Sequence, residues 1–202
     1  MHRILLACLC AAVLCSCLGV ESRLSVRNDG SGTLSLEYRI PRSAGDLGRS
    51  PDKDAPVPLP VEKADFLRAI EGIPGLRLAR YTRRADEENV TIHAEVAFRR
   101  IDDLAKVPAL GDAGLSIVES GGKHTLTQVV AGSPESPTTA ESLAMIDSLF
   151  AGGSVTVVLQ TPAPMTPGPL GTLSADRRTL SWTATIGDLA RRTGSVVLTA
   201  TW

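Results

Sequence analysis

The 202-residue chain is poor in aromatic residues: it contains three Phe, two Tyr and two Trp. Sites that stack sugars or bases usually rely on several aromatic side chains, so this scarcity argues against a sugar or nucleic-acid groove. Cysteine is absent from residue 18 onward. No disulfide can form within that part of the chain, and its stability must come from a core of Val, Leu, Ile and Ala.

An excess of charge of one sign is missing as well. The chain has 21 basic and 22 acidic residues, a net charge of −1 with neutral histidines. Nucleic-acid-binding proteins usually carry a basic excess, so no nucleic-acid partner is predicted. No segment beyond the N-terminal region has 18 consecutive uncharged apolar residues, which excludes a protein that crosses a membrane with several helices.

Signature motifs of catalysis are also missing. The sequence has no G-x-S-x-G elbow, no Gly-rich phosphate loop followed by lysine and no D-x-D-x-D-G calcium loop. The acidic groups at 86–88 and 102–103 are explained more simply as turns and helix starts. We therefore predict a non-catalytic protein with no catalytic residue, no cofactor and no metal site.

What the chain does have is four cysteines within its first 17 residues, at positions 8, 10, 15 and 17. Arg3 precedes an uncharged apolar run, 4–14, that is too short to span a bilayer as a helix. A positive start followed by a short apolar run is typical of a secretory signal peptide. Because free cysteine behaves as a small apolar residue, Cys8 and Cys10 fit within that run.

The segment Leu14-Cys15-Ser16-Cys17 resembles the lipobox of bacterial lipoproteins. In that family an aliphatic residue and two small residues precede an invariant, lipidated cysteine. The resemblance implies that the signal peptide 1–16 is removed and that Cys17 is the acylated new N-terminus. Cys15 is a poorer candidate, because Val13 and Leu14 are too large for the small positions. The alternative is an ordinary secretory signal with an incidental cysteine.

Acylation of Cys17 implies that the membrane is a partner, because two or three acyl chains hold a protein stably on a bilayer. Loss of Arg3 with the signal peptide changes the net charge from −1 to −2. We expect a bacterial cell-envelope protein that faces the periplasm or the exterior. Inner and outer membrane both stay open, and so does the oligomeric state.

The pattern after Cys17 predicts an α+β fold of antiparallel sheets with two covering helices. Alternating apolar residues indicate strands, and apolar residues at helical spacing indicate helices. The first half contains a hairpin at 24–40, a Pro-rich loop at 41–60, a helix at 61–73, strands at 76–83 and 90–98, and a short helix or turn from Ile101.

The second half repeats this order. It contains a hairpin at 115–127, a loop at 133–138, a helix from Thr138 or Thr139 to Phe150, a strand at 155–159, a Pro-rich loop at 162–171, and strands at 179–186 and 195–202. Matched features lie 91 residues apart at the first hairpin and 85 apart at the Asp-Leu corners 103–104 and 188–189. The repeat predicts two similar ββαββ units, 17–110 and 111–202, the second with one extra strand. Two unrelated units with the same order, or one compact domain, are the alternatives.

Some polar residues are candidates for a metal site or a lipid-binding surface. His93 and Glu95 share the polar face of the 90–98 strand, but two ligands do not make a metal site, and His124 is expected in a turn of the other unit. Four Arg-Arg pairs flank strand ends, at 83–84, 99–100, 177–178 and 191–192. Gathered on one rim they would suit anionic lipid headgroups; the neighbouring acids at 86, 102, 176 and 188 favour solvated, ion-paired strand ends.

The order of features is similar to the mycobacterial LppM-type lipoprotein domain. The similarity rests on a strand soon after the lipidated cysteine, the hairpin that ends at Pro41, the 155–159 strand, and the polar turn and Trp-bearing strand of "LSADRRTLSW", 173–182. It implies a membrane-anchored α+β domain outside the cytoplasm with roles in lipid binding, the envelope or host interaction. Members often carry a membrane helix after the domain, and none is expected here.

Together these features predict a membrane-anchored, extracytoplasmic bacterial lipoprotein that binds a lipid or hydrophobic ligand, or an envelope protein. A structural or host-interaction surface lipoprotein is one alternative. A hydrolase whose residues come together from distant positions is the other. A deep apolar cavity between sheet and helices would favour lipid binding, and a flat polar surface would favour a structural or partner role.

Overall fold

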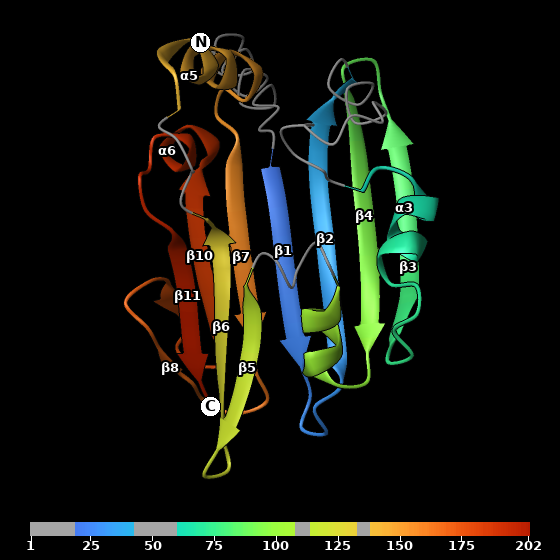
Figure 1. Cartoon of the computed structure of the whole chain (residues 1–202), viewed down its shortest axis with the longest axis vertical. Helices are drawn as coiled ribbons and strands as arrows, with labels where there is room; N and C mark the ends of the chain where they lie inside the picture. Colours follow the sequence, from blue (N-terminus) through green and yellow to red (C-terminus); the bar gives the residue numbers. More distant parts are fainter. Residues whose placement is uncertain (1–18, 43–59, 108–113, 133–137) are drawn as a thin grey trace, which may run out of the picture.

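Two β-sheets dominate the computed structural model, which describes residues 19–42, 60–107, 114–132 and 138–202 (Figure 1). The larger sheet has the strand order β3 (Leu76–Ala85), β4 (Asn89–Phe98), β2 (Gly32–Pro41), β1 (Gly19–Val26), β7 (Ser154–Gln160), β10 (Thr179–Thr185) and β9 (Thr172–Leu173). The smaller sheet has the order β5 (Leu115–Ser120), β6 (Lys123–Ala131), β11 (Val196–Thr201) and β8 (Thr166–Pro167). The helical segments are α3 (Lys63–Ala69), η3 (Ile101–Lys106), α5 (Ala140–Leu149) and α6 (Ile186–Ala190).

Strand β4 shows why these segments form half-buried sheets. Every second residue of the strand is apolar, and all five of these residues are buried: Val90, Ile92, Ala94, Val96 and Phe98. Side chains alternate between the two faces of a strand, so one face of β4 enters the core. Full burial of a large apolar side chain contributes about 1.5–3 kcal/mol, which makes this strand a major part of the core.

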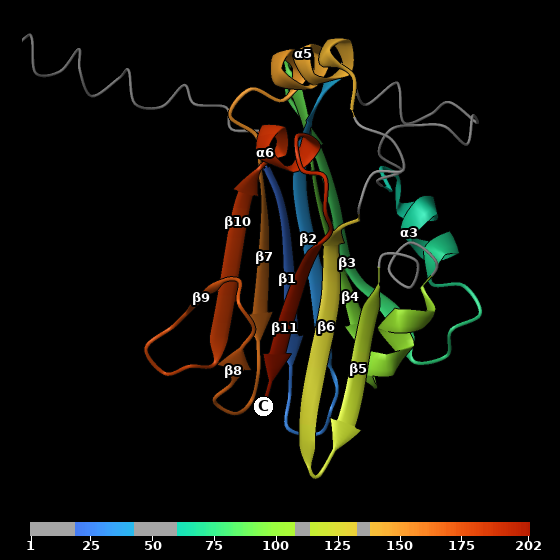
Figure 2. The same ribbon diagram turned by 60° about the vertical axis from the view of Figure 1, so that its left-hand side comes forward.

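The inner face of the large sheet is covered by two different layers. The small sheet packs over β1, β7 and β10, where Leu24, Leu159 and Leu180 meet Leu126 and Ala200 in one cluster. The segments α3 and η3 cover β4 and its neighbours, as Figures 1 and 2 show. On α3, the ring of the buried Phe66 packs against the Tyr81 ring, with the two ring centroids 5.7 Å apart. The Tyr81 hydroxyl donates to the Val61 carbonyl at 2.8 Å.

The predicted fold class, α+β with antiparallel sheets and helices, is confirmed, but the helices are placed differently from expectation. Helix α3 covers part of a sheet face, whereas α5 lies across the ends of the strands (Figure 2). The second sheet takes the covering role that the sequence assigned to the second helix. A sheet presents a wide apolar face, so either a helix or another sheet can bury it.

The two halves of the chain join within the large sheet. Strand β1 pairs with β7 in parallel over seven residue pairs, from Gly19 opposite Ser154 to Ser25 opposite Gln160. The expected ββαββ order recurs in both halves, yet the pairings differ. Strands β1 to β4 all belong to the large sheet, whereas the second half places β5 and β6 in the small sheet and β7 and β10 in the large one. A duplicated unit with a boundary near residue 110 stays a prediction.

Most expected strands and helices occur, with ends shifted by a few residues. The two-residue strands β8 and β9 were not expected, and both lie in or beside the predicted 162–171 loop. The predicted loops at 41–60 and 133–138 lie mostly outside the described residues. No helix among the residues that the structure describes is long and apolar enough to cross a membrane.

Candidate functional site

The first described strand begins two residues after the expected lipidation residue. Cys17 itself lies outside the described residues, so its acylation stays a prediction. Strand β1 starts at Gly19 and is hydrogen-bonded on both sides, to β2 and to β7. An anchor at Cys17 would therefore pull on a central strand, where two ladders of hydrogen bonds share any force.

The residues around Gly19 define one end of the large sheet. Gly19 lies opposite Ser154, and Ser154 lies opposite Thr185 on β10. We call this edge, marked by these three residues, the Gly19 end. Helix α5 precedes β7 and α6 follows β10, so both helices lie at the Gly19 end (Figure 1).

A hollow of about 440 Å³ opens beside β1 at this end. Most of its lining side chains occupy strand positions that alternate with the core positions, on the outward face of the sheet. The hollow is lined by Gly19, Val20, Glu21, Glu37, Tyr38, Arg39, Thr91, Ser154 and Thr156. Its carboxylates, guanidinium and hydroxyls suit a polar partner better than an acyl chain, because burying them against hydrocarbon would leave polar groups unpaired.

Charged side chains near the hollow already have partners. Glu37 Oε2 lies 3.6 Å from His93 Nδ1, and Glu21 Oε1 accepts from Arg23 at 2.8 Å. Arg39, another lining residue, has its Nη2 atom 3.4 Å from Asp86 Oδ2. These exposed pairs contribute little to stability, typically below about 1 kcal/mol each. Acidic and basic side chains are both present around the hollow, so it has no excess of positive charge that would attract a polyanion.

Tyr38 lies beneath this surface, with its side chain on the core side. The residue is 1% exposed, and its hydroxyl has no hydrogen-bond partner among the described residues. Burial raises the pKa of Tyr38 far above its ordinary value, and the Tyr81 and Asp65 side chains raise it further. The phenol is therefore neutral at physiological pH and does not act as a base.

The candidate histidines do not come together. His93 lies on the outward face of β4, as expected, with Glu95 two residues further along the same face. His124 was expected in a turn, but it is the second residue of β6, and its ring lies 5.6 Å from that of Trp202. Among the described residues no group of three or more His, Cys, Asp or Glu is arranged to hold a metal ion.

The hypothesis that the four Arg-Arg pairs gather on one rim is wrong. Arg84 lies opposite Thr91 near the Gly19 end, whereas Arg100 follows Phe98 at the opposite end of β4. The pair 177–178 precedes β10 and lies at the end opposite the Gly19 end. The pair 191–192 follows α6 and lies at the Gly19 end. Two pairs lie at each end because antiparallel strands send consecutive chain ends in opposite directions.

Only part of the expected ion pairing of these arginines occurs. Arg100 pairs with Asp102 at 3.2 Å, as expected from the sequence. Arg83 instead lies 3.6 Å from Glu62, and Arg191 pairs with Asp147 on α5. The strand ends are therefore solvated and ion-paired, although several partners come from distant parts of the chain.

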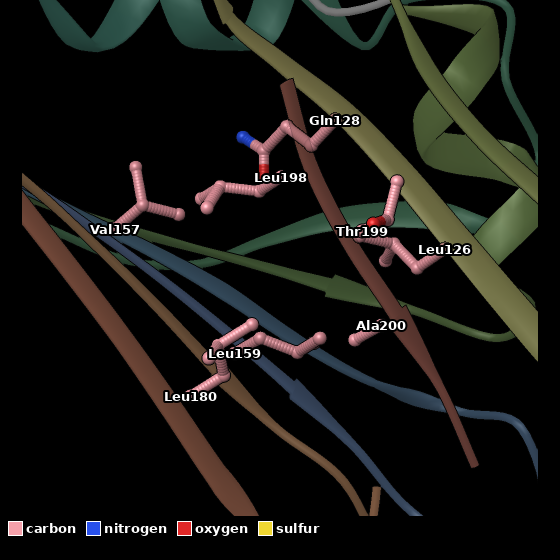
Figure 3. Close-up of a pocket in the computed structure, with 8 residues that line it drawn as sticks. All are labelled: Leu126, Gln128, Val157, Leu159, Leu180, Leu198, Thr199 and Ala200. Carbon is pink, nitrogen blue, oxygen red and sulfur yellow. The ribbon is translucent and has the colours of Figure 1, made fainter. Parts of the chain in front are cut away.

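The space between the two sheets is filled. A gap between the sheets has a volume of about 10 Å³, about the space needed for a single water. Figure 3 shows the residues around it: Leu126, Gln128, Val157, Leu159, Leu180, Leu198, Thr199 and Ala200. An acyl chain has no room in this gap, so the gap is not the deep apolar cavity that would favour lipid binding.

Sequence reasoning missed the hollow. It is formed by three short segments, 19–21, 37–39 and 154–156, together with Thr91. The hairpin pairing of the first two was predictable, but the parallel pairing of β1 with β7 joins residues 135 positions apart. The one available signal was Gly19, a residue without a side chain at the start of a strand.

The fold defines a class: an α+β domain of two facing sheets. No protein-family model matches the chain, and no curated protein matches it. Among solved structures, the NMR structure of the folded domain of LppM from Mycobacterium tuberculosis is similar, with a TM-score of 0.44 and 13% identity. The match covers 92% of this chain and 88% of that domain. Likeness at this level is too low to transfer a function from one protein to the other.

Proposed function

We propose that the protein is an extracytoplasmic bacterial lipoprotein, anchored through acylated Cys17, whose folded domain is non-catalytic and binds at its surface. The observation that carries the anchor is the spacing between the lipobox-like segment 14–17 and the start of β1 at Gly19. A signal peptide is absent from the mature protein. The fold therefore must not need residues 1–16, and a first strand that starts at Gly19 meets this condition.

The surface, rather than the interior, is the binding region. The gap of about 10 Å³ between the sheets is too small for a ligand, whereas the hollow at the Gly19 end has about 440 Å³ and a polar lining. Small-molecule pockets are usually concave and mostly apolar, and this hollow is open and polar. It suits the polar surface of another envelope component.

The test of the anchor is Cys17→Ser in cells that express the full-length protein. The wild-type protein is expected in the membrane fraction and should incorporate a radiolabelled or alkyne-tagged fatty acid. The serine variant should lose both the label and the membrane association, because serine provides no thiol for diacylation. Cys15→Ser is the matched control and should behave as wild type. A labelled, membrane-bound Cys17→Ser variant would rule out the proposed anchor.

The test of surface binding uses a photo-crosslinking amino acid at Thr91, on the rim of the hollow, in the anchored protein. Val118, which is 60% exposed on β5 in the other sheet, is the control position. A discrete adduct from position 91 that is absent from position 118 supports the proposal. Equal, diffuse adducts at both positions would show that the hollow binds nothing in particular, and the proposal would fail.

The purified domain should carry no co-isolated lipid when its own acyl chains are absent. Mass spectrometry of a version that begins at residue 18 measures this directly. A stoichiometric lipid in that preparation would contradict surface binding, because it would require an apolar cavity larger than the gap between the sheets.

A further inference from the structure

Strand β3 forms one edge of the large sheet. It has ten residues, stands at the end of the strand order and pairs only with β4 among the described strands (Figure 1). Among the described residues no loop or helix is hydrogen-bonded to the backbone of residues 77–84 from the other side. At a sheet edge the N–H and C=O groups of alternate residues point outward, where a further strand can pair with them. The edge of β3 is long enough for such a strand.

Three exposed arginines share one face of β3. Arg77, Arg80 and Arg84 lie opposite positions 97, 95 and 91 of β4, which all belong to the outward face of the sheet. The bulge between Leu78 and Arg80 makes this possible, because regular alternation would place residues 77 and 80 on opposite faces. Thr82 occupies the one remaining outward position between them. We call Arg77, Arg80 and Arg84 the arginine row.

The positive charge of the arginine row is largely uncompensated. Strand β3 contains no acidic residue, and its fourth arginine, Arg83, points to the other face, 3.6 Å from Glu62. Within the part of the chain that the structure describes, no arginine of the row forms an ion pair. Glu95 lies opposite Arg80 on β4 and offsets part of the charge. Three positive charges against one negative charge favour an acidic partner.

The spacing of the row fits an extended chain. Side chains on one face of a strand recur about every 7 Å, so the row extends about 20 Å along β3. A strand added at this edge, with acids at alternate positions, places carboxylates opposite arginines, and such directly opposed charges stabilise a strand pair. A second copy of this chain does not fit, because antiparallel pairing of β3 with itself in full overlap places Arg77 opposite Arg84, and like charges repel.

We propose that the edge of β3 is an interaction surface that receives an extended, acidic segment of another protein as an added strand. Backbone hydrogen bonds to β3 provide affinity, and alternate Asp or Glu side chains opposite the arginine row provide specificity. The same arginines disfavour neutral and basic strands, since charged side chains on an edge prevent indiscriminate pairing. This surface goes beyond the proposed function and does not depend on the anchor at Cys17.

The experiment measures, by fluorescence anisotropy, the binding of synthetic peptides to the whole chain purified in mild detergent. The probe is a fluorescein-labelled peptide as long as β3 in which Glu alternates with Thr and Val. A peptide with Lys in place of Glu tests the charge. Two N-methylated versions of the acidic peptide, one for each alternate set of backbone amides, keep the charge but remove hydrogen-bond donors. The acidic peptide should bind severalfold more tightly than the lysine peptide and than at least one N-methylated version.

Charge reversal in the row provides the matched variants. Arg77→Glu combined with Arg84→Glu should weaken binding of the acidic peptide severalfold and strengthen binding of the lysine peptide. Arg178→Glu combined with Arg192→Glu is the control, because it changes the net charge equally at two exposed arginines that lie outside β3. This control should bind both peptides as the wild type does. Circular dichroism checks that both double variants are folded.

Hydrogen exchange locates the peptide. The acidic peptide should slow exchange of amides in β3 but not in β5, an edge strand of the small sheet whose only charged residue is Glu119. Absence of binding, equal binding of the acidic peptide and both N-methylated versions, or unchanged binding in Arg77→Glu/Arg84→Glu would overturn the inference. Full protection of β3 amides before peptide is added would also overturn it, because this chain or a second copy would then cover the edge. None of these results bears on acylation of Cys17.

Discussion

At the scale of the residue, Tyr38 combines full burial with an unsatisfied polar atom. Its ring belongs to the cluster that contains Phe66 and Ile92, but its hydroxyl has no hydrogen-bond partner in the part of the chain that the structure describes. A buried hydroxyl without a hydrogen bond costs about 1–3 kcal/mol relative to one that is satisfied. The ring therefore stabilises the core while the oxygen opposes it.

Tyr38→Phe should accordingly leave the free energy of unfolding unchanged or raise it by about 1 kcal/mol. Urea unfolding monitored by circular dichroism measures the difference. Tyr81→Phe is the matched control and should lower stability, because the Tyr81 hydroxyl donates to the Val61 carbonyl at 2.8 Å. A loss of stability in Tyr38→Phe as large as that in the control would mean that the hydroxyl has a partner.

Asp86 provides a second residue-scale test, through pH. The backbone amides of Asn89 and Glu88 donate to its carboxylate and lower its pKa, with a further contribution from the charge of Arg39. A carboxyl whose folded-state pKa is depressed stabilises the protein above its unfolded-state pKa, about 3.9. That contribution disappears as the pH falls through the lower, folded-state pKa.

Asp86→Asn should therefore lower the urea midpoint at neutral pH, and the difference from wild type should shrink at pH values below about 4. Glu87→Gln, in the same turn, is the control, since the side chain of Glu87 makes no bond among the described residues. A difference between Asp86→Asn and wild type that stays constant with pH would show that the carboxylate charge does not stabilise the turn.

At the scale of the element, the hairpin of β1 and β2 depends on a close approach at Gly32. A Cβ atom there would lie 2.0 Å from the Ser25 carbonyl oxygen and 2.4 Å from the Phe98 ring. The oxygen belongs to the backbone of β1, which cannot move without disturbing the strand. Gly32→Ala should therefore destabilise the protein by about 1–3 kcal/mol, the usual cost of overpacking.

Thermal and urea unfolding of Gly32→Ala measure this cost. Gly194→Ala is the control, because a Cβ there meets no atom of the described residues within 4 Å and Gly194 does not have a left-handed conformation. The two variants make the same chemical change, so equal stability of both would show that β1 and β2 are not packed as closely as described.

The strands and helices were largely predictable from the sequence, whereas the strand or sheet that each one packs against was not. Alternation in 90–98 identifies a strand with one buried face, and β4 has that face. The same kind of alternation in 115–127 does not say which sheet receives the hairpin of β5 and β6, because any apolar face can cover it. Strands β8 and β9 contain two residues each, too few to alternate. A bulge between Leu78 and Arg80 restores Tyr81 to the inner face, and no residue pattern marks it.

The candidate site was less predictable than the fold for the same physical reason. Cys17 is identified by a local motif, so sequence suffices to propose it. The hollow and the position of α5 both depend on the parallel pairing of β1 with β7, and pairing over such a separation is set by packing of the whole core rather than by neighbouring residues.

At the scale of the whole molecule, that parallel pair makes the two halves depend on each other. Seven residue pairs join β1 to β7, and the apolar cluster around Leu159 and Leu180 includes residues from both halves and both sheets. Either half alone would expose one side of this junction. It would also lose apolar contacts on which the other half depends, and a small domain has little stability in reserve.

We therefore expect residues 17–202 to unfold in one cooperative transition, although the sequence repeat predicts two units. The halves carry different probes: Tyr38 and Tyr81 lie in the first, and Trp182 and Trp202 in the second. Tryptophan fluorescence, tyrosine resonances in NMR spectra and far-ultraviolet circular dichroism should give coincident urea curves. The isolated fragments 17–110 and 111–202, each with Cys17 replaced by serine where present, should show no cooperative transition and little amide dispersion. Two separated transitions, or a folded fragment, would instead establish two independently folding domains.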